Sequence, residues 1–188
     1  MTKNTDNTAR PIQDGAGIDL ALARIAAEIV EKLEPSDGLA ILGVRRRGVH
    51  LANRLCAKLE AILKRPVLSG VLDITLYRDD LTTVSDRPTL RGTSIPFDIG
   101  NLNVVLVDDV LYTGRTIRAA LDSLENLGRP RRIQLAVLID RGHRELPIQA
   151  DYVGKFVQTG DDEIVEVRLM EEDGENQVVV VKRPVHER

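Results

Sequence analysis

Apolar side chains recur at helical spacing in three parts of the chain. Between residues 19 and 33, and again over residues 49–63, they return every three or four positions, which predicts two amphipathic helices. A third helix is expected over residues 118–127, where Gly128 and Pro130 supply the stop signal. Each of these helices has one apolar face that must be buried against another element.

Short runs without polar interruption lie between the helices. Residues 39–44, 103–107 and 133–139 are such runs, typical of strands covered on both faces, and residues 67–77 are rich in β-branched side chains and predict a longer strand. Strands that alternate with helices imply right-handed βαβ units. The pattern therefore predicts an α/β protein with a mainly parallel sheet flanked by helices.

The remaining segments are polar or short. The polar stretch over residues 79–92 predicts an extended, flexible loop. Near the end of the chain a turn over residues 172–176 is expected to join two strands as a hairpin. The expected short strands lie over residues 152–157, 164–169 and 177–182. Residues 1–14 are interpreted as a flexible leader and residues 15–188 as a single domain.

Composition narrows the class of protein. The 188 residues are 43% hydrophobic and 29% charged, as in an ordinary globular domain. The single cysteine, Cys56, permits no internal disulfide, and the three histidines are too scattered to predict a metal cluster. No apolar run approaches the length of a membrane span or a signal peptide. We therefore expect a cytoplasmic protein without a membrane partner.

The net charge of −3 conceals an uneven distribution. Residues 45–65 hold seven basic groups and one acidic group, whereas residues 161–188 hold nine acidic and four basic groups. Arginine grips phosphate through two parallel hydrogen bonds, so the basic segment is a candidate anion site. This distribution suits one highly charged small molecule, although the basic segment could equally serve contacts between copies of the chain.

The central motif covers residues 104–116. Four apolar residues precede Asp108 and Asp109, and a turn that contains Thr113 and Gly114 opens the next helix. Ligands of parallel sheets bind beyond the carboxyl ends of the strands, and the amides of a helix N-terminus suit a monophosphate. Carboxylates accept hydrogen bonds from ribose hydroxyls. The motif therefore predicts a site for a phosphorylated ribose.

The acidic pair also has other interpretations. Asp108 and Asp109 could cap a helix, or mark a phosphoacceptor receiver domain, although the lysine and further acid of that class are not evident. The chain contains neither the P-loop pattern nor the glycine pattern of dinucleotide sites. The thirteen-residue arrangement is more specific than any of its parts.

This arrangement resembles the phosphoribosyl pyrophosphate (PRPP) signature of the type I phosphoribosyltransferases. Together with residues 73–80 and 134–147, it is similar to the PyrR family, which are bifunctional pyrimidine-operon attenuation proteins and uracil phosphoribosyltransferases. The resemblance extends from about residue 19 to residue 182. It implies the type I phosphoribosyltransferase fold, with a mainly parallel sheet, a flexible loop and small C-terminal hood strands.

The resemblance also implies the reaction PRPP + uracil → UMP + pyrophosphate. Asp108 and Asp109 would be catalytic and hold the ribose hydroxyls, with Mg²⁺ bound chiefly through PRPP and with Asp108 or Asp109 nearby. The residues that would bind the 5′-phosphate are Leu111, Tyr112, Thr113, Gly114, Arg115 and Thr116. The pyrophosphate loop would consist of Arg45, Arg46, Arg47 and Gly48. Taken alone, that loop could be a solvated basic turn.

Two further segments receive roles from the resemblance. Arg78, at the start of the expected flexible loop, would contact pyrophosphate and act in catalysis, with an incidental surface charge as the alternative. Uracil would bind at Asp140, Arg141 and Gly142. His143 is interpreted as a structural or RNA-facing side chain rather than as a general acid or base.

The regulatory half of the resemblance rests on fewer residues. In the family's RNA-binding members, UMP strengthens binding to pyrimidine-operon leader RNA, and the matching residues here are Arg144 and Lys155. The chain has Gln149 where such members commonly carry Arg, and Ala23 and Ala27 where they commonly carry polar or basic side chains, which reduces the number of phosphate contacts. The family forms dimers and assemblies of dimers. The leading hypothesis is thus an enzyme with regulatory potential; alternatives are an RNA-binding attenuator with minor catalysis, and a phosphoribosyltransferase for another base.

Overall fold

A parallel sheet of five strands forms the centre of the protein in the computed structural model, which describes residues 9–34, 37–74 and 92–183. The strand order is β3-β2-β4-β5-β6, and all neighbouring pairs are parallel. Their bounds are Leu39–Val44 for β2, Leu68–Leu72 for β3, Asn103–Leu111 for β4, Arg132–Asp140 for β5 and Tyr152–Phe156 for β6. This confirms the α/β class and the parallel sheet predicted from the alternation of apolar runs and helices.

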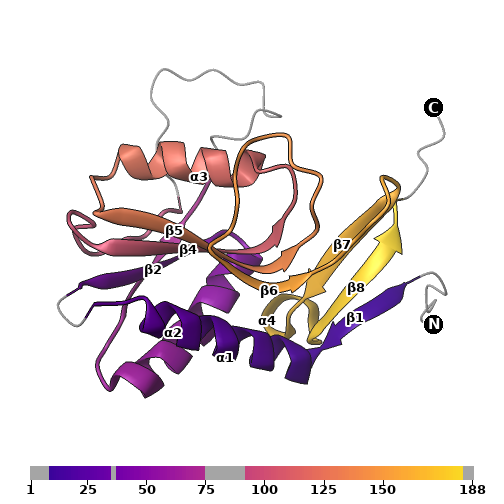
Figure 1. Ribbon diagram of the computed structural model, residues 1–188, viewed down its shortest axis with the longest axis horizontal. Helices are drawn as coiled ribbons and strands as arrows, with labels where there is room; N and C mark the ends of the chain where they lie inside the picture. The colour runs from indigo at the N-terminus through magenta and orange to yellow at the C-terminus, as the bar shows by residue number, and fades with distance from the viewer. Residues whose placement is uncertain (1–8, 35–36, 75–91, 184–188) are drawn as a thin grey trace.

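Helices cover both faces of this sheet (Figure 1). Helices α1 (Gly15–Glu31) and α2 (Arg47–Leu63) pack on one face, and α3 (Arg115–Glu125) packs on the other. Two hydrophobic cores result, one on each face, because the central strands have apolar side chains in both directions. Within the described part of the chain, none of the helices has the length and apolar content needed to cross a bilayer.

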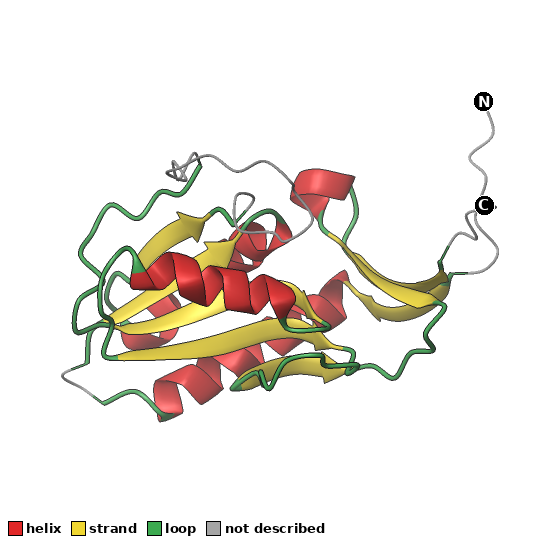
Figure 2. Ribbon diagram, turned by 90° about the horizontal axis from the view of Figure 1, so that it is seen from above, coloured by secondary structure: helices red, strands yellow, loops and turns green. Residues whose placement is uncertain are grey.

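A small antiparallel sheet projects from one end of the large one (Figure 2). Its order is β1-β8-β7, and a short helix, α4, lies between β7 and β8. We call these four elements the hood; their bounds are Arg10–Asp14 for β1, Glu163–Arg168 for β7, Met170–Asp173 for α4 and Gln177–Lys182 for β8. The expected hairpin of the last two strands is confirmed, with one helical turn inside its connection.

The N-terminal end of the hood differs from the sequence-based expectation. Residues 10–14, expected within a flexible leader, form β1 and pair with β8 from Arg10 opposite Val180 to Asp14 opposite Gln177. Asp14 also caps α1 by accepting a hydrogen bond of 2.8 Å from the Gly17 amide, so that helix begins earlier than residue 19. Ile12 is the one strongly apolar residue of this segment, so the sequence gives no strand signal there. The partner strand, β8, lies at the other end of the chain.

Four further boundaries also differ. Strand β4, expected to end at residue 107, continues through the acidic pair, because Asp108 and Val110 still pair with β5. Helix α2 begins at Arg47 and α3 at Arg115, so both start inside the turns expected to precede them. The strand predicted over residues 67–77 ends at Leu72 as β3, and residues 75–77 lie outside the described residues.

Candidate active site at the carboxyl end of the parallel sheet

Three sequence-predicted segments meet at one edge of the large sheet. Residues 45–48 follow β2, residues 111–116 close β4 and lead into α3, and residues 140–142 close β5. Strands β2, β4 and β5 are parallel neighbours, so their carboxyl ends lie side by side. The fold therefore assembles segments that are separate motifs in the sequence.

The two carboxylates of the central motif have different surroundings. Successive side chains of a strand point to opposite faces, and Asp109 lines a cleft of about 310 Å³ that also contains Arg47 and residues of the hood. Asp108 is buried, and its Oδ1 accepts a hydrogen bond of 2.9 Å from the Asp109 amide. Of the acidic pair, Asp109 is thus the side chain presented to the cleft.

Burial raises the pKa of Asp108 well above its ordinary value. Loss of hydration is the largest cause, and the neighbouring charge of Asp109 adds to it, while the hydrogen bond from the Asp109 amide acts in the opposite direction. A carboxyl with a raised pKa in the folded state favours folding below its unfolded pKa of about 4, and that contribution is lost as the pH rises through the folded value. Ionisation of Asp108 beside Asp109 therefore lowers the stability of the folded protein.

Replacing Asp108 with asparagine is expected to weaken the dependence of stability on pH. The amide keeps the shape of the carboxyl and cannot ionise, so the loss of stability with rising pH should be smaller in the variant, by about 2 to 4 °C in Tm, or about 1 kcal/mol in a chain of this size. Thermal unfolding between pH 4 and pH 8 measures this loss. The exposed Asp122→Asn is the matched control, and an equal change in pH dependence in both variants would contradict this electrostatic account.

Arg47 joins the cleft to the hood. Its Nε and Nη2 donate to the two carboxylate oxygens of Asp173 at 3.2 and 2.7 Å. This bond raises the pKa of Arg47 and lowers that of Asp173. Asp173 also accepts a hydrogen bond of 2.8 Å from the Leu169 amide, so the hood fixes the position of its carboxylate.

Two more contacts continue this pairing along α2. His50 Nε2 lies 2.9 Å from Glu172 Oε1, and Arg54 donates twice to Glu171 at 3.0 and 2.6 Å. The basic segment (residues 45–65) and the acidic segment (residues 161–188) are both evident in the sequence, but their contact is not predicted there. Opposite charge was the one sequence feature that pointed to this contact, and the tertiary fold brings the two segments together.

Gly48 permits the close approach of α2 to β4. A Cβ at this position would lie 2.4 Å from the Val107 carbonyl oxygen and 3.2 Å from the Asp108 Cα. Both atoms belong to β4, which is paired with β2 and β5, so this strand cannot easily move away from α2. The glycine thus sets the position of the adjacent Arg47 relative to the acidic pair.

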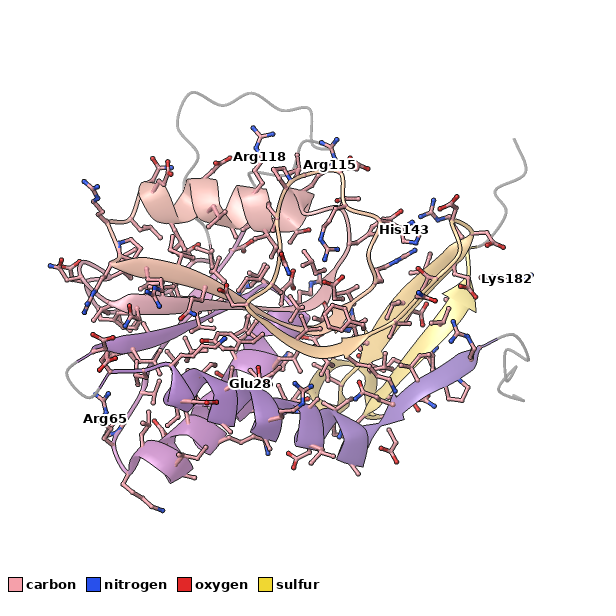
Figure 3. The ribbon with its side chains drawn as sticks, viewed as in Figure 1. Glu28, Arg65, Arg115, Arg118, His143 and Lys182 are labelled. Atoms are coloured by element: carbon pink, nitrogen blue, oxygen red, sulfur yellow. The ribbon has the colours of Figure 1, made fainter. Side chains whose placement is uncertain are left out.

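The turn between β4 and α3 leaves backbone amides available. Gly114 lies at the N-cap position of α3 with φ of 92°, a left-handed conformation that favours glycine, and no side chain caps the helix. Thr113 Oγ1 accepts a hydrogen bond of 3.3 Å from the Arg115 amide. Arg115 and Arg118 project away from the sheet (Figure 3), and Thr116 is exposed. The turn therefore suits an anion through its backbone rather than through its arginine.

The segment after β5 is held by its own side chains. Asp140 is buried, and its Oδ1 accepts a hydrogen bond of 2.9 Å from the Gly142 amide. Arg141 is also buried; its guanidinium carbon lies 4.1 Å from the centroid of the Tyr112 ring, and its Nε donates to Thr159 Oγ1 at 3.2 Å. A cation stacked on Tyr112 thus links this segment to the turn after β4.

His143 lies between the large sheet and the hood (Figure 3). Its Nε2 lies 2.9 Å from the Thr159 carbonyl oxygen and its Nδ1 3.4 Å from Asp161 Oδ1. Both ring nitrogens therefore face the connection between β6 and β7. This arrangement favours the structural interpretation of His143 over a role in proton transfer.

The remaining predicted residues are more dispersed. Arg45 and Arg46 are exposed, and Arg45 Nη1 lies 3.4 Å from Asp73 Oδ2. Lys155 is exposed and donates to the Ile12 carbonyl oxygen at 3.2 Å. Arg144, expected on an RNA-facing surface, instead directs its guanidinium toward backbone carbonyls and Asp140. Arg78 lies outside the described residues, as does the expected flexible loop up to residue 91.

The described carboxylates offer few ligands to a metal ion. Across residues 9–34, 37–74 and 92–183, no group of three or more His, Cys, Asp or Glu side chains is arranged to hold one. Asp109 presents its carboxylate oxygens to the cleft, whereas Asp108 is buried behind it. A single carboxylate of this kind suits an ion that takes most of its ligands from a bound substrate and water.

Comparison with known proteins places these features in a family. The model of the phosphoribosyl transferase domain matches residues 10–181. A bifunctional protein PyrR of Pelotomaculum thermopropionicum is 58% identical over 171 residues, which cover 91% of this chain and 94% of that protein. A bifunctional protein PyrR of Thermus thermophilus is 58% identical over 163 residues, or 87% of this chain and 90% of that protein.

Solved structures support the same fold. A hypoxanthine phosphoribosyltransferase from Trypanosoma cruzi, solved as the ternary substrates complex of a mutant, aligns with a TM-score of 0.70 and 22% identity. The alignment covers 93% of this chain and 95% of that one. At this level of identity the likeness establishes the fold and leaves the choice of base to other arguments.

Proposed function

This chain belongs to the PyrR proteins of the phosphoribosyl transferase family, and on that basis we propose that its cleft forms UMP and pyrophosphate from uracil and PRPP. The protein is accordingly a uracil phosphoribosyltransferase with a second role in the regulation of pyrimidine operons. One observation supports the catalytic assignment above others. Asp109 of the PRPP motif and Arg47 of the pyrophosphate loop, which lie far apart in sequence, line the same cleft.

Each part of PRPP has a matching segment in this assignment. The ribose hydroxyls donate to Asp109, with Asp108 behind it, and the 5′-phosphate binds the uncapped amides that precede α3. The pyrophosphate group binds Arg47 and the backbone beside Gly48. Arg45 and Arg46, which are exposed, belong to the same loop and are assigned to the same group. Arg78 is assigned to the same group by its place in the motif alone.

Physically, the reaction separates a positively charged ribosyl group from pyrophosphate. A carboxylate at Asp109 stabilises the positive charge that develops on the ring, and Arg47 stabilises the negative charge on the departing group. Strand β4 places Asp109 and the start of α2 places Arg47, so both groups line the cleft before PRPP binds. The residues thus supply opposite charges at the two ends of the breaking bond.

Mg²⁺ fits the oxygen donors that the cleft provides. The resemblance to the phosphoribosyltransferases implies this ion, and Asp109 would hold it through one or two oxygens while PRPP and water supply the others. When bound, the ion neutralises charge on the pyrophosphate group. Its requirement is testable, because addition of EDTA in excess of Mg²⁺ should abolish UMP formation.

Uracil is assigned to residues 140–142. Asp140 holds the Gly142 amide, and φ of 73° at Gly142 turns the backbone sharply at the end of β5. Backbone groups at this turn can read the donor and acceptor pattern of a pyrimidine edge. The buried Arg141, stacked on Tyr112, forms one wall of this segment.

Formation of UMP by the purified protein tests the catalytic proposal. With uracil, PRPP and Mg²⁺ we expect UMP and pyrophosphate in equal amounts, measured by chromatography. Failure to form UMP at any substrate concentration would contradict the proposal. Heat-denatured protein is the control for non-enzymatic breakdown of PRPP.

The regulatory role involves a different surface. Binding of pyrimidine-operon leader RNA rests on family membership, and the structure offers Lys155 at an exposed position. Gln149 and Ala27 are exposed without positive charge, and Arg144 is directed into the protein. A gel-shift titration with leader RNA, with and without UMP, tests this role. We expect tighter binding with UMP, whereas RNA binding that ignores UMP would contradict regulation through the cleft.

Asp173→Asn is expected to lower the KM for PRPP. In the free protein the Asp173 carboxylate occupies the guanidinium of Arg47, so pyrophosphate and this carboxylate compete for the same donors. Asparagine retains an oxygen for the Leu169 amide and removes the competing charge. We expect the KM to fall about three- to ten-fold, measured by initial rates at saturating uracil.

Glu171→Gln is the matched control for that experiment. Glu171 pairs with Arg54 in the same series of α2–α4 contacts, and Arg54 lies about two helical turns from Arg47. The control removes an equal charge and an equal number of ion pairs from the hood. A similar KM decrease in both variants would mean that overall charge, rather than competition for Arg47, determines PRPP affinity.

A further inference from the structure

The guanidinium of Arg144 lies at the junction of two substrate segments. Its Nη1 donates to the carbonyl oxygens of Tyr112 at 2.8 Å and Leu111 at 3.4 Å, which belong to the turn after β4. The same Nη1 lies 3.1 Å from the Gly142 carbonyl oxygen, in the turn after β5. One nitrogen atom therefore contacts the backbone of both turns.

The other nitrogens of Arg144 fix the side chain from the opposite direction. Nε donates to the Ile148 carbonyl oxygen at 3.0 Å, and Nη2 forms an ion pair with the buried Asp140. All three nitrogens thus have partners within the protein, and the planar shape of the group fixes the angle between them.

Backbone hydrogen bonds connect the same two turns. The Arg141 amide donates to the Leu111 carbonyl oxygen at 3.1 Å, and the Glu145 and Leu146 amides both donate to the Thr113 carbonyl oxygen at 3.0 and 3.1 Å. Arg144 lies between these contacts in sequence, and its side chain joins the two turns by hydrogen bonds, in addition to the stacking of Arg141 on Tyr112. The two turns are consequently built as one unit rather than as independent loops.

We propose that Arg144 is a positioning residue that fixes the distance and angle between the phosphate turn (residues 111–116) and the base turn (residues 140–142). The inference rests on the proposed function, which assigns the 5′-phosphate to the first turn and uracil to the second. Arg144 touches neither substrate in this account. It aligns the base with the ribose by holding the backbone of both turns.

Correct alignment matters most when both turns are engaged by one molecule. UMP contains the phosphate and the base on one frame, so it gains from two turns held at the right separation. Ribose 5-phosphate engages the phosphate turn alone and gains nothing from that separation. The rate of the chemical step depends on the same alignment, because a small misplacement of the base relative to the ribose lowers the rate strongly.

The test compares the affinities of these two ligands in Arg144→Lys and Arg144→Gln. Isothermal titration calorimetry measures the Kd of UMP and of ribose 5-phosphate for each variant and for the unchanged protein. We expect the Kd of UMP to rise at least ten-fold and that of ribose 5-phosphate to change less than three-fold. Lysine keeps the charge but cannot reach all these acceptors, so Arg144→Lys should behave like Arg144→Gln.

Kinetics supply a second readout. We expect kcat to fall at least ten-fold while the KM for PRPP changes less than three-fold, since PRPP uses the phosphate turn but not the base turn. Arg131→Lys is the matched control, because Arg131 pairs with the buried Asp37 at the opposite end of the sheet. It should lower Tm without changing the ratio of the two Kd values.

Two results would overturn the inference. Equal losses of affinity for UMP and ribose 5-phosphate would make Arg144 a support of the phosphate turn alone, and an unchanged Kd for UMP would show that the turns are aligned without it. Failure of the proposed function would give a different result, because the unchanged protein would then neither bind UMP nor form it. Retained ribose 5-phosphate binding confirms that a variant is folded.

Discussion

Asp109→Asn is expected to lower kcat/KM for UMP formation by about 10²- to 10³-fold while the protein keeps its fold. Asp109 presents the carboxylate that lines the cleft beside Arg47, so its charge acts directly on the ribosyl group in the transition state. Its Oδ1 accepts a hydrogen bond of 3.0 Å from the Val110 amide, and the oxygen of asparagine can accept the same bond. The substitution therefore removes charge without removing a structural contact.

Stability and activity should separate in this variant. Removal of the Asp109 charge also relieves the repulsion that helps to raise the pKa of Asp108, so Tm should stay the same or increase. Initial rates across PRPP concentrations and thermal unfolding of the same sample provide both measurements. Near-native kcat/KM in a folded Asp109→Asn protein would contradict the role given to this carboxylate.

Gly48→Ala is expected to damage both the fold and the site. The added methyl group would lie 2.4 Å from the Val107 carbonyl oxygen, so the start of α2 must move away from β4. Overpacking of this kind costs about 1 to 3 kcal/mol, which lowers Tm by several degrees in a chain of this size. Because Arg47 is the neighbouring residue, we also expect kcat/KM to fall by at least about 10²-fold.

Gly128→Ala separates the loss of stability from the loss of activity. A Cβ at Gly128 would lie 3.0 Å from Ile99 Cγ1, and its φ of 153° is unfavourable for other residues, so some destabilisation is expected there too. Gly128 lies between α3 and β5, at the amino end of the strands and far from the cleft. A comparable fall in activity for both alanine variants, assayed well below their Tm, would contradict the positional argument for Gly48.

The sheet and the placement of the three turns could be predicted from the sequence because both depend on local signals. Unbroken apolar runs identify buried strands, and in a parallel sheet the turns that follow them share one edge. The prediction failed where a partner lies far along the chain. Strand β1 depends on pairing with β8, and β4 continues through Asp108 because β5 offers Val137 as its partner.

The same reason explains what the sequence missed in the candidate site. Arg47 and Asp173 are separated by 126 residues, and no sequence pattern predicts that they form a pair. The family resemblance placed Arg144 on an RNA-facing surface, whereas its acceptors are mostly backbone carbonyls that no sequence pattern identifies. The role of Arg78 stays a prediction from its motif.

A competition among bases tests the central claim most directly. The purified protein is given PRPP, Mg²⁺ and equal concentrations of uracil, hypoxanthine and guanine, and the nucleotides formed are separated and quantified. The account predicts UMP as the dominant product, with the yield lost in Asp109→Asn. Formation of IMP or GMP in preference to UMP would contradict it, as would the absence of any nucleotide.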